Sequence, residues 1–167
     1  MPATAVPVTR PFHPRDTRAC MAIFDSNLPR FFAMHERAGF LRYLQQPQRT
    51  QDYQVIACGD HVLACGGLEI DAAGTAAFCW GMVEQARHRQ GLGTALAQAR
   101  IALAQGRGAR RLTLSTSQHT QAFYAALGFT VTRVVRDGHG PGLDAVDMER
   151  ALAPVQVGPA RTTGSGA

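Results

Sequence analysis

A glycine-rich turn between an apolar run and a segment with helical periodicity constrains this chain more than any other feature. Residues 76–83 form the apolar run, and the turn reads Arg89-Gln90-Gly91-Leu92-Gly93-Thr94. Apolar side chains recur after the turn at the spacing of a helix with one buried face. Such a turn leaves backbone N–H groups unpaired at the positive end of a helix, where an anion is favoured. Its two glycines let the backbone approach a phosphate without an intervening Cβ.

Two familiar phosphate-binding motifs are excluded at this turn. The dinucleotide fingerprint needs a third glycine at the position that Leu96 occupies. The Walker A motif needs a lysine, and the chain contains none. Taken by itself, the Gly-x-Gly sequence fits a purely structural turn as well as a phosphate site.

The composition is typical of a globular protein of one domain. The chain has 167 residues, of which 46% are hydrophobic and 17% are charged. No stretch reaches the roughly 18 uncharged apolar residues of a membrane span, and no secretory signal is visible at the start. The cysteines show neither a C-x-x-C arrangement nor a metal-ligand spacing with histidine. We therefore expect reduced thiols, no metal, no membrane partner and a cytoplasmic location.

The positive charge is concentrated around the turn. The formal net charge is +5, and all 17 basic residues are arginine. Six of them lie between positions 84 and 111, where Glu84 is the one acidic residue. Guanidinium groups match phosphate oxygens, so this excess suggests a polyanionic partner, and a solvated helix face is the plainer alternative. No aromatic residues are interleaved with these arginines, so we expect no nucleic-acid partner.

Periodicity and turn residues predict an α+β fold, a mixed sheet with helices on both faces. Strands are expected at 6–12, 53–58, 62–68, 76–83, 111–114, 129–135 and 145–148. Helices are expected at 16–24, 32–44, 92–105 and 120–127. We expect one domain over 1–152. From its Pro, Gly, Ser and Thr content, we expect a flexible tail over 153–167.

A second motif lies downstream of the turn. The segment Thr116-Ser117-Gln118-His119-Thr120-Gln121-Ala122-Phe123-Tyr124 leads to Gly128-Phe129. Together, the Arg-Gln-Gly-Leu-Gly turn and this Phe-Tyr-x-x-x-Gly-Phe segment resemble the two signatures of the GNAT superfamily of acyl-CoA-dependent N-acetyltransferases. The resemblance spans about residues 8–152. It implies the GNAT fold, an α/β/α sandwich around a mixed, mostly antiparallel sheet.

The resemblance implies acetyl-CoA as co-substrate and no metal, with the pyrophosphate over the turn. The residues that it assigns to CoA are Met82, Val83, His88, Arg89, Gln90, Gly91, Leu92, Gly93, Thr94, Ser117 and Tyr124. Two of them depart from the family pattern. His88 stands where the family has glutamine or arginine, and Ser117 stands where it often has asparagine.

The resemblance also implies direct transfer, in which an amine attacks the thioester carbonyl. A backbone N–H near Met82 or Val83 would stabilise the oxyanion, and Tyr124 occupies the position of the general acid for the leaving thiolate. A core aromatic is the structural alternative for Tyr124. The general base is left open between a water relay and three side chains, Glu69, Glu84 and His119.

The acceptor is expected to be a primary amine of a small molecule or a peptide. The first two helices and the loop of the last strands are implied to form the rim of its site, where His139 is one of the polar residues. The residues expected to contact the acceptor are Asp25, Asn27 and Trp80. The function expected is N-acetyl transfer from acetyl-CoA. A non-catalytic acyl-CoA-binding regulatory protein is the alternative, favoured by the substitutions at 88 and 117. A homodimer is left open.

Overall fold

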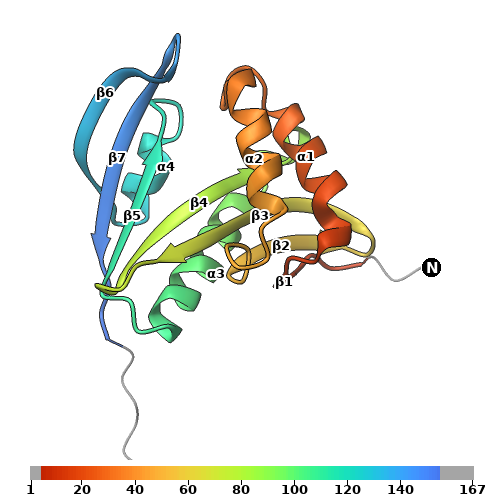
Figure 1. The fold of residues 1–167 in the computed structure, drawn as a ribbon, viewed down its shortest axis with the longest axis horizontal. Coiled ribbons are helices and arrows are strands. Elements are labelled where there is room, and N and C mark those ends of the chain that lie inside the picture. The colour runs from red at the N-terminus through yellow and green to blue at the C-terminus, as the bar shows by residue number, and fades with distance from the viewer. Residues whose placement is uncertain (1–4, 155–167) are drawn as a thin grey trace, which may run out of the picture.

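The computed structural model of the protein describes residues 5–154, which form a seven-stranded sheet with helices on both faces (Figure 1). The strands are β1 (Val8–Pro11), β2 (Tyr53–Cys58), β3 (His61–Ile70), β4 (Thr75–Val83), β5 (Arg111–Thr116), β6 (Thr130–Gly140) and β7 (Leu143–Ala151). The α-helices are α1 (Thr17–Ser26), α2 (Arg37–Leu44), α3 (Leu92–Gly106) and α4 (Gln121–Ala126). Short 3-10 turns cover Pro14–Asp16, Met34–Glu36 and Gln85–Arg87.

The sheet is mixed and mostly antiparallel. Its strand order is β1-β2-β3-β4-β5-β7-β6, and β4 with β5 is the parallel pair. Parallel neighbours need a crossover connection, which α3 supplies. The expected α+β class and α/β/α sandwich are confirmed.

Two hydrophobic layers hold the helices on the sheet. Helices α1 and α2 cover one face of β2–β4, where Phe24 and Phe40 pack with Tyr53. Helix α3 lies against the other face, where Ile101 packs with Leu112 of β5. Side chains on β4 therefore face either the α1–α2 layer or the α3 layer.

Strands β4 and β5 separate after a short parallel contact. Thr75–Ala77 pair with Arg111–Thr113, and the register between the two strands extends no farther in the described part of the chain. Both strands continue beyond this contact, so their ends diverge (Figure 1). The turn after β4 and the segment after β5 lie at the open end of the resulting wedge.

A bulge in β4 sorts its side chains between the two layers. The pairing of β3 with β4 shifts register between Cys65 and Gly67. Opposite this shift, Trp80 adopts a φ of 46°, which is uncommon for a bulky residue. The Trp80 indole packs with Phe40 in the α1–α2 layer, whereas a Cβ on Gly81 would point at α3.

The expected helix over 32–44 is wrong at its start. Ala33 has an extended backbone, one 3-10 turn follows it, and α2 begins at Arg37. The Phe32 ring lies 5.0 Å from the Phe24 ring and 6.5 Å from the Trp80 ring, measured between centroids. This packing holds the segment against β4, and it overrides the helical periodicity.

The last two strands are longer than expected. Strands β6 and β7 form a hairpin, which is paired from Thr130 to Glu149. Because of this pairing, each strand continues past the apolar residues from which it was predicted. The tail expected over 153–167 lies, from residue 155 onward, outside the described residues.

Candidate active site

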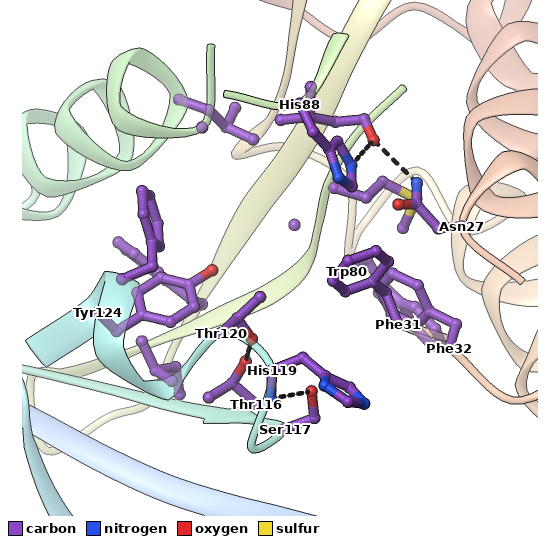
Figure 2. Close-up of a pocket in the computed structure, with 18 of the residues that line it drawn as sticks. Asn27, Phe31, Phe32, Trp80, His88, Thr116, Ser117, His119, Thr120 and Tyr124 are labelled. Carbon is purple, nitrogen blue, oxygen red and sulfur yellow. Dashed lines mark hydrogen bonds between the residues drawn. The ribbon is translucent and has the colours of Figure 1, made fainter. Parts of the chain in front are cut away.

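The wedge between β4 and β5 is a cleft of about 920 Å³ (Figure 2). Its walls come from the segment after α1, from β4 and the turn that follows it, from α3, from the end of β5 and from α4. Both sequence motifs therefore face one space, although 33 positions separate Gly91 from Tyr124.

The turn at the start of α3 has the geometry expected of an anion site. Gly91 precedes the helix with a φ of +83°, and a Cβ on it would meet no atom within 4 Å. The Ala95 N–H donates back to the Gly91 carbonyl at 3.0 Å. The N–H groups of Leu92, Gly93 and Thr94 come before it, at the positive end of the helix, and such groups have no acceptor within a helix.

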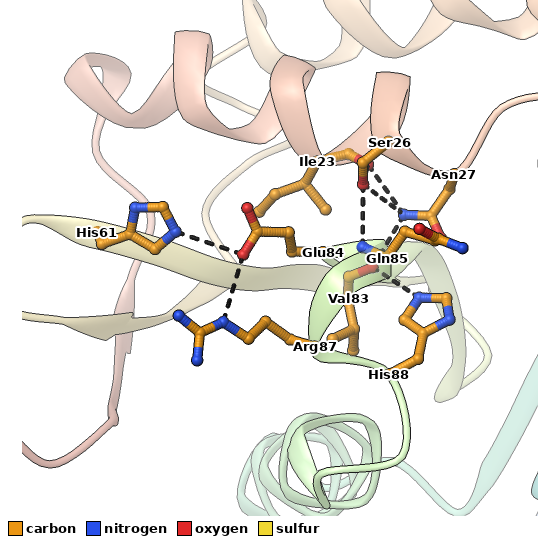
Figure 3. Close-up of polar contacts among 9 residues, drawn as sticks. All are labelled: Ile23, Ser26, Asn27, His61, Val83, Glu84, Gln85, Arg87 and His88. Carbon is orange, nitrogen blue, oxygen red and sulfur yellow. Dashed lines mark hydrogen bonds and ion pairs between the residues drawn. The ribbon is translucent and has the colours of Figure 1, made fainter.

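His88 is held by the end of β4 (Figure 3). Its Nε2 lies 2.9 Å from the carbonyl oxygen of Val83. A carbonyl only accepts, so Nε2 carries the hydrogen and donates it. Arg87 and Arg89 also line the cleft, and Arg87 Nε lies 3.7 Å from a carboxylate oxygen of Glu84. The two arginines bring positive charge to the end of the cleft where the turn lies.

Tyr124 is packed by its ring and directs its hydroxyl into the cleft (Figure 2). The ring centroid lies 6.5 Å from that of Phe78 and 5.8 Å from that of Phe129. The hydroxyls of Tyr43 and Tyr53 donate to backbone carbonyls. The Tyr124 hydroxyl has no such partner among residues 5–154, so a bound molecule can take its hydrogen bond.

The segment after β5 is organised around Ser117. Its side chain is buried, and its carbonyl accepts hydrogen bonds from the N–H groups of Thr120 and Gln121 at 3.2 and 3.1 Å. Its hydroxyl oxygen accepts from the His119 N–H at 3.3 Å. Ser117 thus shapes the start of α4 and holds His119 at the cleft.

An aromatic wall closes the cleft on the α1–α2 side. Trp80 stacks with Phe32 at 6.5 Å between centroids, and both line the cleft. Phe31 lies edge-on to two imidazoles, with centroids 5.1 Å from His88 and 6.0 Å from His119. The wall presents aromatic faces and edges to whatever enters from this side.

Some of the residues predicted for the acceptor and for the general base line the cleft, and others lie on the surface. Asn27 lines the cleft but is buried, and its Nδ2 donates at 2.9 Å to backbone carbonyls of both α1 and β4. Asp25 lies outside the cleft and accepts from Arg37 at 2.7 and 3.0 Å. Glu69 lies outside it too, paired with Arg49 at 2.6 Å.

Most of the residues predicted for CoA meet in the cleft. Those that line it are Met82, Val83, His88, Arg89, Gly91, Gly93, Thr94, Ser117 and Tyr124. Gln90 and Leu92 do not. Gln90 is exposed, and the Leu92 side chain packs in the layer under α3 with Leu96.

Sequence reasoning gave no site function to Phe31, Glu36 and Arg100, which also line the cleft. His139, which was expected at the rim of the acceptor site, lines the cleft from the end of β6 and lies 3.0 Å from the Ser115 hydroxyl. Arg100 did leave a signal, because it interrupts the apolar face of α3 between Leu96 and Ala104.

Cys79 lines the cleft with a largely buried thiol. Burial raises the pKa of its thiol to about 11, and the Tyr43 hydroxyl lies 3.3 Å from its sulfur. The thiol is therefore protonated at neutral pH, and a covalent mechanism through it is disfavoured.

Neither a metal centre nor a membrane span is found within residues 5–154. No His, Cys, Asp and Glu side chains there gather in threes or more to hold a metal ion. None of the helices in that range is long and apolar enough to cross a membrane.

The sequence matches the profile of one protein family, described as Acetyltransferase (GNAT) family, over residues 20–129. The chain belongs to the GNAT acetyltransferase family. The matched range runs from α1 to Phe129, so it contains the glycine-rich turn, Tyr124 and both sides of the cleft.

Solved structures share the GNAT fold at low sequence identity. A putative GNAT acetyltransferase from Desulfovibrio desulfuricans has a TM-score of 0.76 at 21% identity, covering 89% of this chain and 100% of that one. The ribosomal-protein-S18-alanine N-acetyltransferase from Escherichia coli has a TM-score of 0.75 at 19% identity, covering 92% and 98%. The putative acetyltransferase yncA from Salmonella typhimurium, solved with its cofactor acetyl-CoA, has a TM-score of 0.72 at 18% identity, covering 93% and 99%. No curated protein matches the sequence.

Proposed function

We propose that the protein is an acetyl-CoA-dependent N-acetyltransferase that acts on a primary amine of a small molecule or a peptide. The main support is that the start of α3, through Gly93 and Thr94, and the hydroxyl of Tyr124 line the same cleft. The first suits a phosphate and the second suits a leaving group, and CoA carries both. Membership of the GNAT family supports the same assignment.

The turn and its arginines are the proposed site of the CoA pyrophosphate. Backbone N–H groups of 92–94 would donate to its oxygens, and Arg87 and Arg89 would add positive charge. The pantetheine arm would continue between β4 and β5, past Met82 and Ser117. Because Ser117 has one hydroxyl where an amide is usual, we expect fewer hydrogen bonds to this arm from its side chain.

The proposed reaction is a direct acyl transfer. The amine nitrogen attacks the thioester carbonyl carbon, and a backbone N–H at the end of β4, near Met82 or Val83, stabilises the oxyanion. The C–S bond then breaks, and the sulfur takes the proton of the Tyr124 hydroxyl. The amide product and free CoA leave, and solvent returns a proton to the tyrosine.

The proton lost by the amine needs an acceptor, which we assign to His119. Its imidazole lines the cleft, whereas Glu69 would first have to leave Arg49 and then enter the cleft. An imidazole is a suitable base near neutral pH, directly or through one water. The aromatic wall of Phe31, Phe32 and Trp80 would attract the ammonium form of the acceptor before it loses that proton.

The second candidate is an acyl-CoA-binding regulatory protein without catalysis. The observation that favours it is the bond from His88 Nε2 to the Val83 carbonyl, because this occupies a side chain that stands where the family binds phosphate. A protein of this kind would bind acyl-CoA through the turn but would not depend on the Tyr124 hydroxyl.

Release of free thiol from acetyl-CoA over a panel of amines separates the two candidates. The panel would contain amino acids, polyamines, aminoglycosides and short peptides with a free N-terminus, and Tyr124→Phe would be the control. Amine-dependent release that needs Tyr124 supports the enzyme. Saturable acetyl-CoA binding with no release for any amine supports the regulator, and absence of CoA binding contradicts both.

A further inference from the structure

Arg100 is the one buried arginine among the described residues, and the proposed reaction does not use it. It is 2% exposed and lies on the inner face of α3, where its buried neighbours along the helix are Leu96, Ala97, Ile101 and Ala104. Removing a guanidinium from water is costly unless a partner compensates its charge. The same side chain also lines the cleft.

Two glycines make room for this guanidinium. A Cβ on Gly81 of β4 would lie 2.7 and 2.8 Å from the two terminal nitrogens of Arg100. A Cβ on Gly66 of β3 would lie 3.2 Å from its Cζ. Any larger residue at position 81 would displace the arginine, so the two strands and α3 together form a recess of defined shape for it.

The guanidinium has a stacking partner but lacks a charge partner. It lies over the Phe78 ring, with Cζ 3.9 Å from the ring centroid. Its Nε is buried without a hydrogen-bond partner, and none of the ion pairs among residues 5–154 includes Arg100. Stacking satisfies the face of the guanidinium and leaves its edge, which carries the N–H donors, for a ligand.

The position of Arg100 separates it from the proposed phosphate site. It stands eight residues after Leu92, the first residue of α3. At the rise of an α-helix this is about 12 Å along the axis from the turn. It lies beside Phe78 and Gly81 of β4. The last two residues of this strand, Met82 and Val83, are the ones that we assign to the thioester. A planar fork of donors at this depth matches a carboxylate.

We propose that Arg100 binds a carboxylate that one of the two substrates carries into the cleft. This inference rests on the proposed acyl transfer and deepens it. Arg100 lies on the α3 side of β4, as does the turn that we assign to CoA, whereas the aromatic wall that we assign to the acceptor lies on the α1–α2 side. The acyl donor is therefore the first source that we consider for the carboxylate. The donor would then be a dicarboxylic acyl thioester such as succinyl-CoA. The second possible source is the acceptor, because an amino acid would bring its own carboxylate into the cleft.

The first arm of the test measures binding of CoA, acetyl-CoA and succinyl-CoA to the wild type and to Arg100→Met. Methionine keeps the length and apolar packing of the side chain without its charge. We expect the wild type to bind succinyl-CoA about tenfold to a hundredfold more tightly than acetyl-CoA, as charge-assisted hydrogen bonds do. Arg100→Met should lose this preference, bind CoA as before, and melt at the same or a higher temperature.

The second arm tests the acceptor as the source. With CoA bound, amino acids and their amides are compared as ligands of the wild type, of Arg100→Met and of Arg100→Lys, which keeps the charge but not the fork. If the wild type binds the amino acid more tightly than its amide, and the Arg100 variants do not, the carboxylate belongs to the acceptor. If the wild type shows no preference in either arm while it binds CoA, the inference is overturned and the proposed function stands. If the wild type does not bind CoA, the proposed function fails, and the inference fails with it.

Discussion

The side-chain amide of Asn27 donates a hydrogen bond of 2.9 Å to the backbone carbonyl of Val83, which lies 56 positions further along the chain (Figure 3). The same nitrogen donates to the Ile23 carbonyl within α1, also at 2.9 Å. Next to it, the Ser26 hydroxyl oxygen accepts from the Gln85 N–H at 3.0 Å. These bonds hold the end of α1 against the end of β4, where the aromatic wall lies beside the turn that precedes α3.

Replacing Asn27 by alanine should lower the free energy of unfolding by about 1–3 kcal/mol. The substitution removes two hydrogen bonds of a buried amide, each of which contributes about 0.5–1.5 kcal/mol, while the Ile23 carbonyl keeps its bond from the Ser26 hydroxyl and the Val83 carbonyl keeps its bond from His88. Urea unfolding of both proteins measures the difference. Gln45→Ala, at an exposed position after α2, is the control and should change the value by no more than about 0.5 kcal/mol. Equal effects of the two substitutions would contradict the bracing function of Asn27.

Gly91→Val should abolish CoA binding, because the valine side chain would occupy the proposed pyrophosphate site. A control at a second glycine separates this effect from backbone strain. Gly91 and Gly74 have φ of +83° and +81°, and a Cβ on either would meet no atom within 4 Å. Valine at either position should therefore cost a similar strain, about 1–3 kcal/mol. Only position 91 lines the cleft, so calorimetric titration should show lost affinity for Gly91→Val and normal affinity for Gly74→Val. Normal CoA affinity in a folded Gly91→Val protein would refute the site.

Tyr124→Phe should lower kcat by about 10² to 10⁴ while leaving CoA affinity and stability nearly unchanged. The ring keeps its packing on Phe78 and Phe129, and only the hydroxyl that faces the cleft is removed. Tyr43→Phe is the opposite control. It removes a hydrogen bond of 3.2 Å to the Arg49 carbonyl and a contact of 3.3 Å with the Cys79 sulfur, neither of which takes part in the proposed reaction, so it should lower stability by about 1 kcal/mol and leave kcat intact. An unchanged kcat in Tyr124→Phe would transfer the acid function to solvent or to His119.

Asp16 should contribute stability that disappears in acid. Hydrogen bonds from Arg10 at 2.8 and 2.9 Å, with a further one from the His13 N–H, hold the pKa of the Asp16 carboxyl below its usual value. A lowered folded-state pKa stabilises the protein above the ordinary value, near 4, and this contribution is lost as the pH falls through the lowered one. Asp16 is buried, whereas Arg10 is partly exposed and its charge is therefore partly screened by solvent. Asp16→Asn should therefore lower the free energy of unfolding by about 2 kcal/mol at pH 7.

Thermal unfolding measures this contribution when the wild type and Asp16→Asn are compared at two pH values. One is pH 7, and the other is pH 2.5 or below, roughly a unit or more under the ordinary carboxyl pKa. The gap between the two melting temperatures should narrow at the lower pH. Asp25→Asn is the matched control, because the Asp25–Arg37 pair is 43% and 41% exposed, and it should cost less than about 1 kcal/mol. A gap that is the same at both pH values would show that the Asp16 charge does not matter.

The parts of the candidate site that could be predicted are those encoded by contiguous residues. A left-handed backbone at Gly91 and unpaired N–H groups at the start of α3 follow from the turn itself, because only glycine adopts that conformation at low cost. The placement of Tyr124 on a short helix that ends before Gly128 is local in the same way. Gly91 and Tyr124 line the same cleft.

The parts that could not be predicted depend on contacts between distant segments. Asp25 and Glu69 were plausible site residues by position, but each lies on the surface beside an arginine from another element. The start of α2 was misplaced because the Phe32 ring packs on Trp80, a residue of β4. Arg100 was passed over as one arginine of a charged stretch, although its helical position is an apolar one.

The sequence by itself determined the α+β class, the glycine-rich turn before α3 and the short helix that carries Tyr124, because each depends on local periodicity, glycine conformation and helix ends. Only the tertiary structure decided which charges enter the cleft. Parallel pairing of β4 with β5 ends at Ala77, and the divergence of the two strands opens the space that Tyr124 faces. Gly66 and Gly81 come from two strands and leave the recess in which Arg100 is buried. Whether a charge is buried or solvated depends on what packs around it, and that packing is set by the whole fold.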